Sequence, residues 1–253
     1  LPHRPVVSAF TATATPEVRE DVISILRLNE PFVIATGFDR KNLFFGVEKP
    51  SNKFLSLIKI IKKYENKSGI IYCSTRKTVE TVFHKLIEKG YPATYYHAGL
   101  DTKGRQNNQE DFLYDRKPFM VATNAFGMGI DKSNVSFVVH YNMPQNIESY
   151  YQEAGRAGRD GEPADCILLY SGQDVRTNRF LIENSENMNS DFTEDMRLAV
   201  KQRDLERLKF MTYYCHTADC LREYILKYFG ERASNYCGNC SNCNTAFETV
   251  DAT

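Results

Sequence analysis

Two arginines lie three residues apart among glycines in the stretch SYYQEAGRAGRDGEP, residues 149–163. An interior glycine destabilises a helix by about 1 kcal/mol relative to alanine, so these glycines favour a backbone that another group approaches closely. The guanidinium groups of Arg156 and Arg159 suit phosphate oxygens, because each offers parallel N–H donors in one plane. The stretch predicts an anion-gripping element. Taken alone, it is equally compatible with a solvated loop that forms ion pairs to Glu153 and Asp160.

A second group of reactive side chains lies near the end of the chain, where five of the seven cysteines fall between residues 215 and 243. An odd number of cysteines crowded at one end argues against a disulfide framework. Four thiolates hold Zn²⁺ tetrahedrally and leave no position for water, which is the pattern of a structural site. The spacing C-x16-C-x2-C-x2-C therefore predicts a zinc site made by Cys220, Cys237, Cys240 and Cys243.

Three other interpretations of the cysteines remain open. Cys215 and His216 lie close enough to Cys220 in sequence to replace it as the upstream ligand. An iron–sulfur cluster also uses C-x2-C-x2-C, but that motif continues with x3-C-P, which this sequence lacks. The cysteines could also be unliganded thiols.

The composition is that of an ordinary globular protein. The 253 residues are 42% hydrophobic and 25% charged, with 32 basic and 32 acidic side chains, so the net charge is zero. This balance lends no support by itself to nucleic-acid binding, which would need basic residues gathered on one face. No apolar run of 18 residues occurs, so we expect no membrane span. We expect an intracellular protein: cytoplasm or nucleoid if bacterial, which the lack of nuclear-type basic runs favours, and nucleus if eukaryotic.

Strand-like runs alternate with helical patterns up to about residue 171. Two ranges, 54–61 and 79–86, repeat apolar residues with helical spacing. Several of the strand-like runs are apolar throughout, as parallel strands covered on both faces are. The class is therefore α/β, with a parallel sheet and right-handed crossovers. The expected strands are 6–10, 32–36, 69–73, 93–97, 119–123, 135–141 and 164–170.

After residue 171 the strand pattern ends and helical segments are expected near 174–184, 192–215 and 219–229. The last part of the chain is short of apolar residues, so a metal would supply stability that packing cannot. We divide the chain into 1–36 as the end of an earlier domain, 37–171 as an α/β domain, and 172–253 as a small helical, metal-bound part. The stretch TGFDRKNL, residues 36–43, reads as a connection.

Polar side chains follow several of the predicted strands. In open parallel sheets, ligands gather at the carboxyl ends of the strands, and helix N-termini there attract anions. Each such residue alone is more often part of a turn or a structural contact. Together they form a candidate edge made by Ser74, Thr75, Arg76, His97, Thr123, Asn124, Gly129 and Asp131.

The order of these motifs resembles the second motor domain of superfamily-two helicases, and most closely the RecQ family. TATAT (11–15) is similar to the third helicase motif and GIIYCSTR (69–76) to the fourth. VATNAFGMGID through QEAGRAGRDG (121–161) resembles the fifth and sixth, and the helical and cysteine-rich end resembles the family's helical hairpin and zinc platform. The resemblance implies a RecA-like parallel sheet with helices on both faces, followed by a helical zinc-binding subdomain.

The resemblance also implies roles for the residues. Arg159 would be the arginine finger on the γ-phosphate of ATP, Arg156 a second phosphate or coupling contact, and Gln152 a coupling residue. Gly129 and Asp131 would lie at the nucleotide. Toward single-stranded DNA would lie the candidate contacts Ser74, Thr75, Arg76, His97, Thr123 and Asn124.

The implied activity is 3′–5′ unwinding of single-stranded and branched duplex DNA, in DNA repair and recombination, driven by ATP with Mg²⁺. The sequence contains no G-x-x-x-x-G-K-[ST] and no suitable Walker B pair. We expect these in an upstream first motor domain, with ATP bound at the interface, so this chain alone should not hydrolyse ATP. Alternatives are a non-enzymatic zinc-containing nucleic-acid-binding module, an RNA helicase motor domain, and a degenerate regulatory homologue. The oligomeric state is undetermined, and a monomer is compatible with the sequence.

Overall fold

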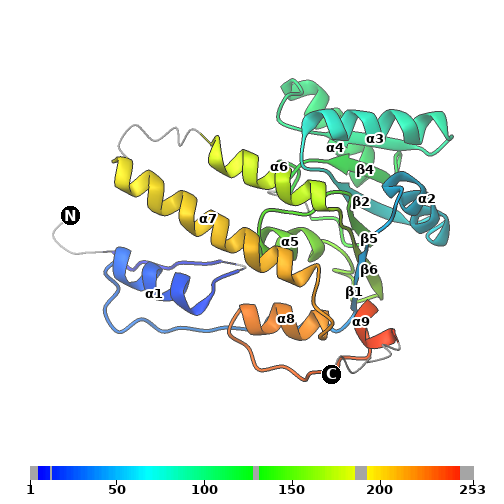
Figure 1. The fold of residues 1–253 in the computed structure, drawn as a ribbon. Coiled ribbons are helices and arrows are strands. Elements are labelled where there is room, and N and C mark those ends of the chain that lie inside the picture. Colours follow the sequence, from blue (N-terminus) through cyan, green and yellow to red (C-terminus); the bar gives the residue numbers. More distant parts are fainter. Residues whose placement is uncertain (1–4, 12, 128–130, 186–192, 246–253) are drawn as a thin grey trace.

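The computed structural model describes residues 5–11, 13–127, 131–185 and 193–245. Its centre is one six-stranded sheet in the order β1-β6-β5-β2-β4-β3 (Figure 1), and every hydrogen-bonded pair of neighbours is parallel. The strands are β1 Leu43–Glu48, β2 Ser68–Tyr72, β3 Ala93–Tyr96, β4 Phe119–Ala122, β5 Val135–His140 and β6 Ala164–Leu169. The predicted α/β class and parallel sheet are confirmed.

Helices cover both faces of the sheet. On one face, α2 (Lys53–Lys63) and α3 (Arg76–Glu88) bury apolar side chains such as Leu57 and Val82 against β2, β4 and β5. On the other, α4 (Thr102–Leu113) and α5 (Ile147–Ala154) contribute Phe112 and Tyr150 to a second core. Two buried faces explain why the central strands are apolar at successive positions.

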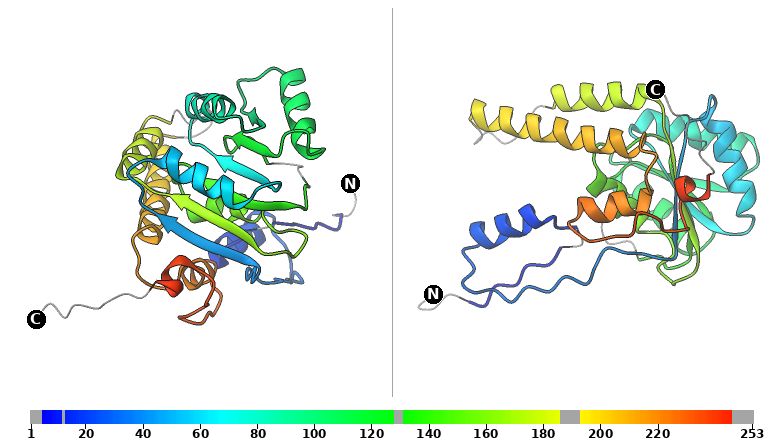
Figure 2. Two further views of the ribbon diagram at one scale, coloured as in Figure 1. Left: turned by 90° about the vertical axis from the view of Figure 1, so that its right-hand side faces the viewer. Right: turned by 60° about the horizontal axis from the view of Figure 1, so that its bottom comes forward.

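The second part of the chain consists of α6 (Gly172–Glu183), α7 (Glu194–Tyr214), α8 (Leu221–Tyr228) and the short α9 (Ser241–Asn244). Figure 2 shows α6 and α7 running side by side, with α8 and α9 nearer the β1 edge of the sheet. Tyr214 of α7 donates a hydrogen bond to the hydroxyl of Tyr150 in α5 at 3.2 Å, and both rings are buried. No helix in the described ranges is long and apolar enough to span a membrane.

The cysteine-rich end lies against the edge strand β1. Cys240 forms a parallel bridge with Phe45, and the backbone N–H of Val47 donates to Ser241 Oγ at 3.3 Å. An uncovered edge strand presents unpaired backbone groups to solvent. The cysteine-rich segment therefore protects this edge of the sheet and joins the two parts into one packed unit.

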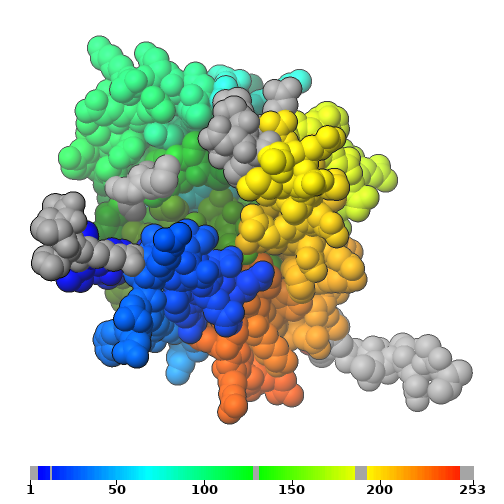
Figure 3. Space-filling view, turned by 90° about the vertical axis from the view of Figure 1, so that its left-hand side faces the viewer, coloured from blue at the N-terminus to red at the C-terminus, as the bar shows by residue number. Residues whose placement is uncertain are grey.

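The N-terminal segment differs from the prediction. Residues 6–10 and 32–36 are not strands, and their large side chains are exposed, with Phe10 at 94% and Phe32 at 90%. Between them lies α1 (Pro16–Ile25), which has no buried residue; Figure 3 shows it, in blue, on the molecular surface. These runs have the composition of buried strands, but no described strand of this chain pairs with them.

The structure also contains one strand that the sequence analysis missed. β1 begins at Leu43, inside the stretch that read as a connection, and pairs along its length with β6. Gly46 interrupts its apolar run, because the side chain of Ile167 fills the space a Cβ would need, at 2.8 Å. Glycine weakens the strand signal in the sequence while satisfying a packing requirement in the fold.

Gly69, in the middle of the sheet, offers a test of this packing. A Cβ built on Gly69 would lie 2.1 Å from Cζ of Phe137, its neighbour in β5. Strands β2 and β5 both lie inside the sheet, and both residues are buried. We therefore expect Gly69→Ala to lower the free energy of unfolding by about 3 kcal/mol through overpacking. Urea denaturation measures this change in the free energy of unfolding. Gly172→Ala is the matched control, because no atom lies within 4 Å of that Cβ position. Equal midpoints for the two variants would contradict the prediction.

Candidate functional site

The loop that carries both arginines, residues 155–161, is here called the arginine loop. α5 ends at Ala154, with Gly155 as its C-cap. Gly158 has φ +55°, and a Cβ there would lie 2.7 Å from the carbonyl oxygen of Glu162. Glycine at position 158 is thus required by the conformation of the turn, and not only by the approach of an outside group. The N–H of Gly158 donates to the carbonyl of Val135 at 2.8 Å, which ties the loop to β5.

Arg159 and Asp131, both predicted site residues, are brought together by the fold. Arg159 Nη1 lies 3.0 Å from Asp131 Oδ1, and the two side chains are 36% and 90% exposed. An exposed ion pair of this kind stabilises a protein by at most about 1 kcal/mol. A phosphate group carrying more than one negative charge can therefore compete with Asp131 for this guanidinium.

Arg156 is less exposed than Arg159 and holds the loop that follows β4. Its Nη1 donates to the carbonyl of Gly127 at 2.7 Å, and a Cβ on Gly127 would fall 2.1 Å from its Nη2. The absent side chain at Gly127 thus makes room for the guanidinium. Arg156 Nε is buried, and no described residue accepts a hydrogen bond from it. Met128, Gly129 and Ile130 follow directly, so the predicted nucleotide residue Gly129 lies outside the described residues.

Gln152 connects the arginine loop to the N-terminal segment. It is exposed on α5, and its Nε2 donates to Thr13 Oγ1 at 2.5 Å. Thr13 belongs to the small-hydroxyl run at residues 11–15, whose last member, Thr15, caps α1 by accepting from Val18 N at 3.3 Å. Two motifs 139 positions apart in sequence therefore meet at one surface.

Two residues that hold the arginine loop were missed by the sequence analysis. Arg40 donates from Nη2 to the carbonyls of Ala157 (3.1 Å) and Gly158 (2.7 Å), and from Nη1 to that of Gly155 (3.4 Å). Asn42 Nδ2 donates to the Gly158 carbonyl as well, at 2.8 Å. The only signal in the sequence was a polar run, DRKN, in a stretch interpreted as a connection.

The predicted polar edge forms at the carboxyl ends of β2 to β5. Ser74, Arg76 and Asn124 are exposed there. Thr75 is the N-cap of α3 and accepts from Thr78 N at 3.1 Å. Ser74 N donates to Asn142 Oδ1 at 3.2 Å, across the β2–β5 boundary. An exposed arginine beside a capped helix N-terminus is suited to phosphate binding.

Two other predicted contacts are buried and already bonded within the protein. His97 is 4% exposed, and its ring lies between Glu80 Oε1 (3.2 Å from Nε2) and the N–H of Gly99 (3.2 Å from Nδ1). Thr123 is 8% exposed, and its hydroxyl accepts from Ala125 N at 3.4 Å. These side chains shape the loops after β3 and β4, and both ring nitrogens of His97 are engaged within the protein.

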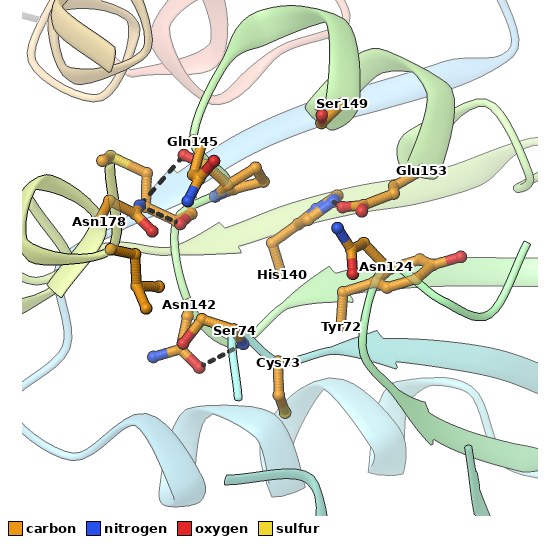
Figure 4. Close-up of a pocket in the computed structure, with 13 residues that line it drawn as sticks. Tyr72, Cys73, Ser74, Asn124, His140, Asn142, Gln145, Ser149, Glu153 and Asn178 are labelled. Carbon is orange, nitrogen blue, oxygen red and sulfur yellow. Dashed lines mark hydrogen bonds and ion pairs between the residues drawn. The ribbon is translucent and has the colours of Figure 1, made fainter. Parts of the chain in front are cut away.

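A cavity opens at this edge (Figure 4), with Ser74, Asn124 and Asn142 among its lining residues. At its floor, His140 Nε2 lies 2.9 Å from Glu153 Oε2, and His140 is fully buried. Glu153 is on α5, so the same helix contributes to this cavity and to the arginine loop. None of the lining residues is a lysine or arginine, so phosphate groups would have to be held by neighbouring residues such as Arg76. The sequence analysis did not identify the His140–Glu153 pair.

The four predicted zinc ligands meet in space. The Sγ atoms of Cys220, Cys237, Cys240 and Cys243 all lie within 4.8 Å of one another, and those of Cys237 and Cys243 are 3.9 Å apart. Tetrahedral geometry with Zn–S bonds of about 2.3 Å requires sulfurs about 3.8 Å apart. Cys215 is not in the group, and His216 lies 2.9 Å from the Tyr170 hydroxyl, so the geometry favours Cys220 as the upstream ligand.

The chemistry of these thiols fits a bound cation. Each sulfur accepts a backbone N–H at 3.3–3.5 Å: Cys220 from Glu223, Cys237 from Asn239, Cys240 from Cys243, and Cys243 from Cys237. Burial raises the pKa of the Cys220 thiol to about 12. Burial acts on Cys243 too, but the Cys237 N–H, the Cys240 thiol and the Gly238 N–H outweigh it and lower its pKa to about 7. Thiolates in partly buried positions require a positive charge, which Zn²⁺ supplies.

The parallel sheet with helices on both faces is a RecA-like fold, the class to which helicase motor domains belong. A family profile described as the helicase conserved C-terminal domain matches residues 52–161. A second, described as RecQ zinc-binding, matches residues 172–244, which include all four cysteines. The chain belongs to the RecQ family of superfamily-two helicases, and the predicted resemblance is confirmed.

Comparison with individual relatives leads to the same family. The chain is 44% identical over 253 residues to the ATP-dependent DNA helicase RecQ of Bacillus subtilis, covering 100% of this chain and 41% of that protein. It is 36% identical over 255 residues to the ATP-dependent helicase SGS1 of Saccharomyces cerevisiae, covering 99% of this chain and 17% of that protein. The chain thus spans less than half the length of these relatives. The structure of S. cerevisiae Dbp5 L327V bound to RNA and ADP BeF3 matches with a TM-score of 0.59 at 22% identity, over 78% of this chain and 54% of that one, which shows the shared fold.

Proposed function

We propose that this chain is the C-terminal motor half of an ATP-dependent 3′–5′ DNA helicase. The observation that carries the proposal is the arginine loop, in which Arg159 stands at the surface and Arg40 holds the backbone beneath it. A rigid backbone under an exposed guanidinium suits an arginine finger, which must meet a transferring phosphoryl group in one geometry.

In this proposal ATP binds between this domain and a first motor domain that supplies the Walker lysine and the Mg²⁺ ligands. Water attacks the γ-phosphorus and the bond to the β–γ bridging oxygen breaks, giving ADP, inorganic phosphate and a proton. Arg159 stabilises the negative charge on the γ-phosphoryl oxygens, and Arg156 and Gly129 support the nucleotide. Gln152 couples the site to the N-terminal segment through Thr13. Asp131 holds Arg159 when nucleotide is absent.

Single-stranded DNA is proposed to lie along the carboxyl ends of the strands. Ser74, Thr75, Arg76 and Asn124 would face its phosphates and sugars without reading sequence. His97 and Thr123 would act indirectly, because their side chains are bonded inside the protein. The 44% identity to an ATP-dependent DNA helicase, RecQ of Bacillus subtilis, supports DNA over RNA as the substrate.

We propose the domain division that the sequence predicted. Residues 37–171 hold all six described strands and form the second RecA-like domain. Residues 172–253 form the helical hairpin and zinc-binding subdomain, of which 186–192 and 246–253 lie outside the described residues. Residues 1–36 are proposed to be the end of the first motor domain, whose sheet would pair with 6–10 and 32–36 and cover Phe10 and Phe32.

The test compares this chain with the full-length protein in ATPase and strand-displacement assays. We expect no turnover by the chain alone, and turnover by the full-length protein that single-stranded DNA stimulates. Displacement should require a 3′ tail on the duplex and fail with a 5′ tail. A full-length protein that binds DNA but never hydrolyses ATP would favour the binding-module or degenerate alternative, and stimulation by RNA alone would favour an RNA motor.

A further inference from the structure

A short segment, residues 37–43, lies between the zinc-binding part and the arginine loop and is here called the connector. The sequence suggested only a linker, yet side chains from both parts hold it. Tyr151 of α5 donates to the Phe38 carbonyl at 2.5 Å, and Phe38 stacks on Phe229 with ring centroids 4.4 Å apart. The connector is therefore held in place by contacts from both parts, although of its residues only Leu43 is buried.

On the zinc side, three polar side chains grip the connector backbone. Glu231 accepts from Phe38 N at 2.7 Å. Asn239, which lies between the ligands Cys237 and Cys240, donates to the carbonyls of Lys41 and Leu43, each at 3.1 Å. The third is Arg222, which contacts both the backbone and a side chain of the connector.

Arg222 is 7% exposed, two residues after the zinc ligand Cys220 at the start of α8. Its Nη1 donates to Asp39 Oδ1 at 2.9 Å and to the Arg40 carbonyl at 2.7 Å, and its Nη2 donates to the Leu43 carbonyl. The guanidinium also lies over the ring of Phe45, 5.3 Å from its centroid. A planar fork of donors can satisfy several acceptors at once, which a lysine cannot.

On the other side, the connector holds the arginine loop. The residue whose carbonyl Arg222 grips is Arg40, and the Arg40 side chain donates to the carbonyls of Gly155, Ala157 and Gly158. A continuous chain of hydrogen bonds thus runs from the residue beside a zinc ligand, through Arg40, to the backbone between Arg156 and Arg159. Every step is a donor–acceptor distance of 3.4 Å or less.

We propose that Arg222 and Arg40 are positioning residues that set the arginine loop from the zinc-binding part. The consequence for turnover rests on the proposed ATPase, but the consequence for the loop does not. Zinc fixes Cys220 and hence the start of α8. That helix positions the guanidinium of Arg222, which in turn positions Arg40 through a hydrogen bond to its carbonyl. The zinc-binding part then does more than cover the edge strand β1, because it determines where the arginine loop stands.

The test is amide hydrogen exchange in the full-length protein with zinc bound, comparing Arg222→Lys and Arg40→Ala with the unmodified protein. The reporter is Gly158 N–H, which donates to Val135 O, and the reference is Cys73 N–H, which donates to Ala122 O in the sheet. We expect exchange at Gly158 to rise tenfold or more in both variants. Exchange at Cys73 and the zinc content should stay unchanged, so that a general loss of stability is distinguished from a displaced loop.

The matched control is Lys227→Ala on the same helix. Lys227 is exposed, pairs with the buried carboxylate of Glu223 and forms no hydrogen bond to the connector, so its loss should leave Gly158 exchange unchanged. The double variant Arg222→Lys/Arg40→Ala should exchange no faster than the faster single variant, because both act through one chain of contacts. Gly158 exchange in Arg222→Lys equal to that in Lys227→Ala would overturn the proposal.

Turnover separates this proposal from the proposed function. In a protein that hydrolyses ATP, Arg222→Lys should lower kcat about tenfold while the Kd for single-stranded DNA changes less than twofold. A protein without ATPase activity would refute the proposed function and leave the exchange result to decide the positioning role. Full ATPase activity together with a tenfold change in loop exchange would refute the link to catalysis.

Discussion

Arg159→Ala in the full-length protein is expected to lower the kcat for DNA-stimulated ATP hydrolysis by about 10³-fold or more. Arginine fingers contribute about 10³–10⁵ in rate where they are required, because they stabilise charge that develops on the transferred phosphoryl group. Arg159 is exposed and its ion pair with Asp131 is a surface contact, so its removal should cost the fold little. Steady-state ATPase assays and thermal unfolding measure the two effects.

The matched control for this variant is Arg116→Ala. Arg116 is also an exposed arginine in an ion pair, with Asp111 at 2.7 Å, but it lies outside the arginine loop. Its loss should leave turnover within twofold. Arg159→Lys retains the charge and should recover only a small part of the rate, since the forked geometry is lost. Turnover unaffected by Arg159→Ala would remove the finger assignment, and Arg156 would then be the arginine to test.

Replacing Cys240 by serine is expected to remove zinc and unfold the C-terminal part of the chain. Cys240 is fully buried, bridges to Phe45 of β1, and shares the thiol cluster with three other cysteines. Structural zinc binding is worth about 10–16 kcal/mol in small zinc domains, which exceeds the stability of most whole domains. Metal analysis should show about one zinc per unmodified chain and close to none in the variant, and circular dichroism should show lost helix.

Cys215→Ala is the matched control for the metal prediction. Cys215 is equally buried and close in sequence, but it lies outside the cluster. It should keep its zinc and lose only about 1–2 kcal/mol of unfolding free energy through the small cavity. Iron in place of zinc would support the iron–sulfur alternative, and full zinc content in Cys240→Ser would mean that the metal is held elsewhere.

The sequence by itself determined the features that depend on local pattern. Alternating apolar runs and helical repeats predicted five of the six strands, at 69–73, 93–97, 119–123, 135–141 and 164–170, and the class of the fold. The C-x2-C-x2-C spacing predicted the metal site, because neighbouring cysteines reach one ion from a tight turn whatever surrounds them. Order along the chain was enough to indicate the RecQ family.

Features that depend on partners distant in sequence were not predicted in this way. Residues 6–10 and 32–36 have strand composition but no partner strand among the described residues, and β1 carries a glycine in its apolar run because Ile167 occupies the space. Strand composition states a preference, whereas a strand also requires a neighbour for its backbone hydrogen bonds.

The arginine loop and the cysteine cluster show the same difference between local pattern and distant contacts. The residue types of the arginine loop and the cysteine cluster were legible in the sequence, but their supports were not. Cys220 could be chosen over Cys215 and His216 only when the four sulfurs were seen together. Arg222 reaches Asp39 across 183 positions, and Arg40 reaches Gly158 across 118. Such contacts exist only after the chain has folded, because sheet order and helix packing, and no local pattern, bring these donors to their acceptors.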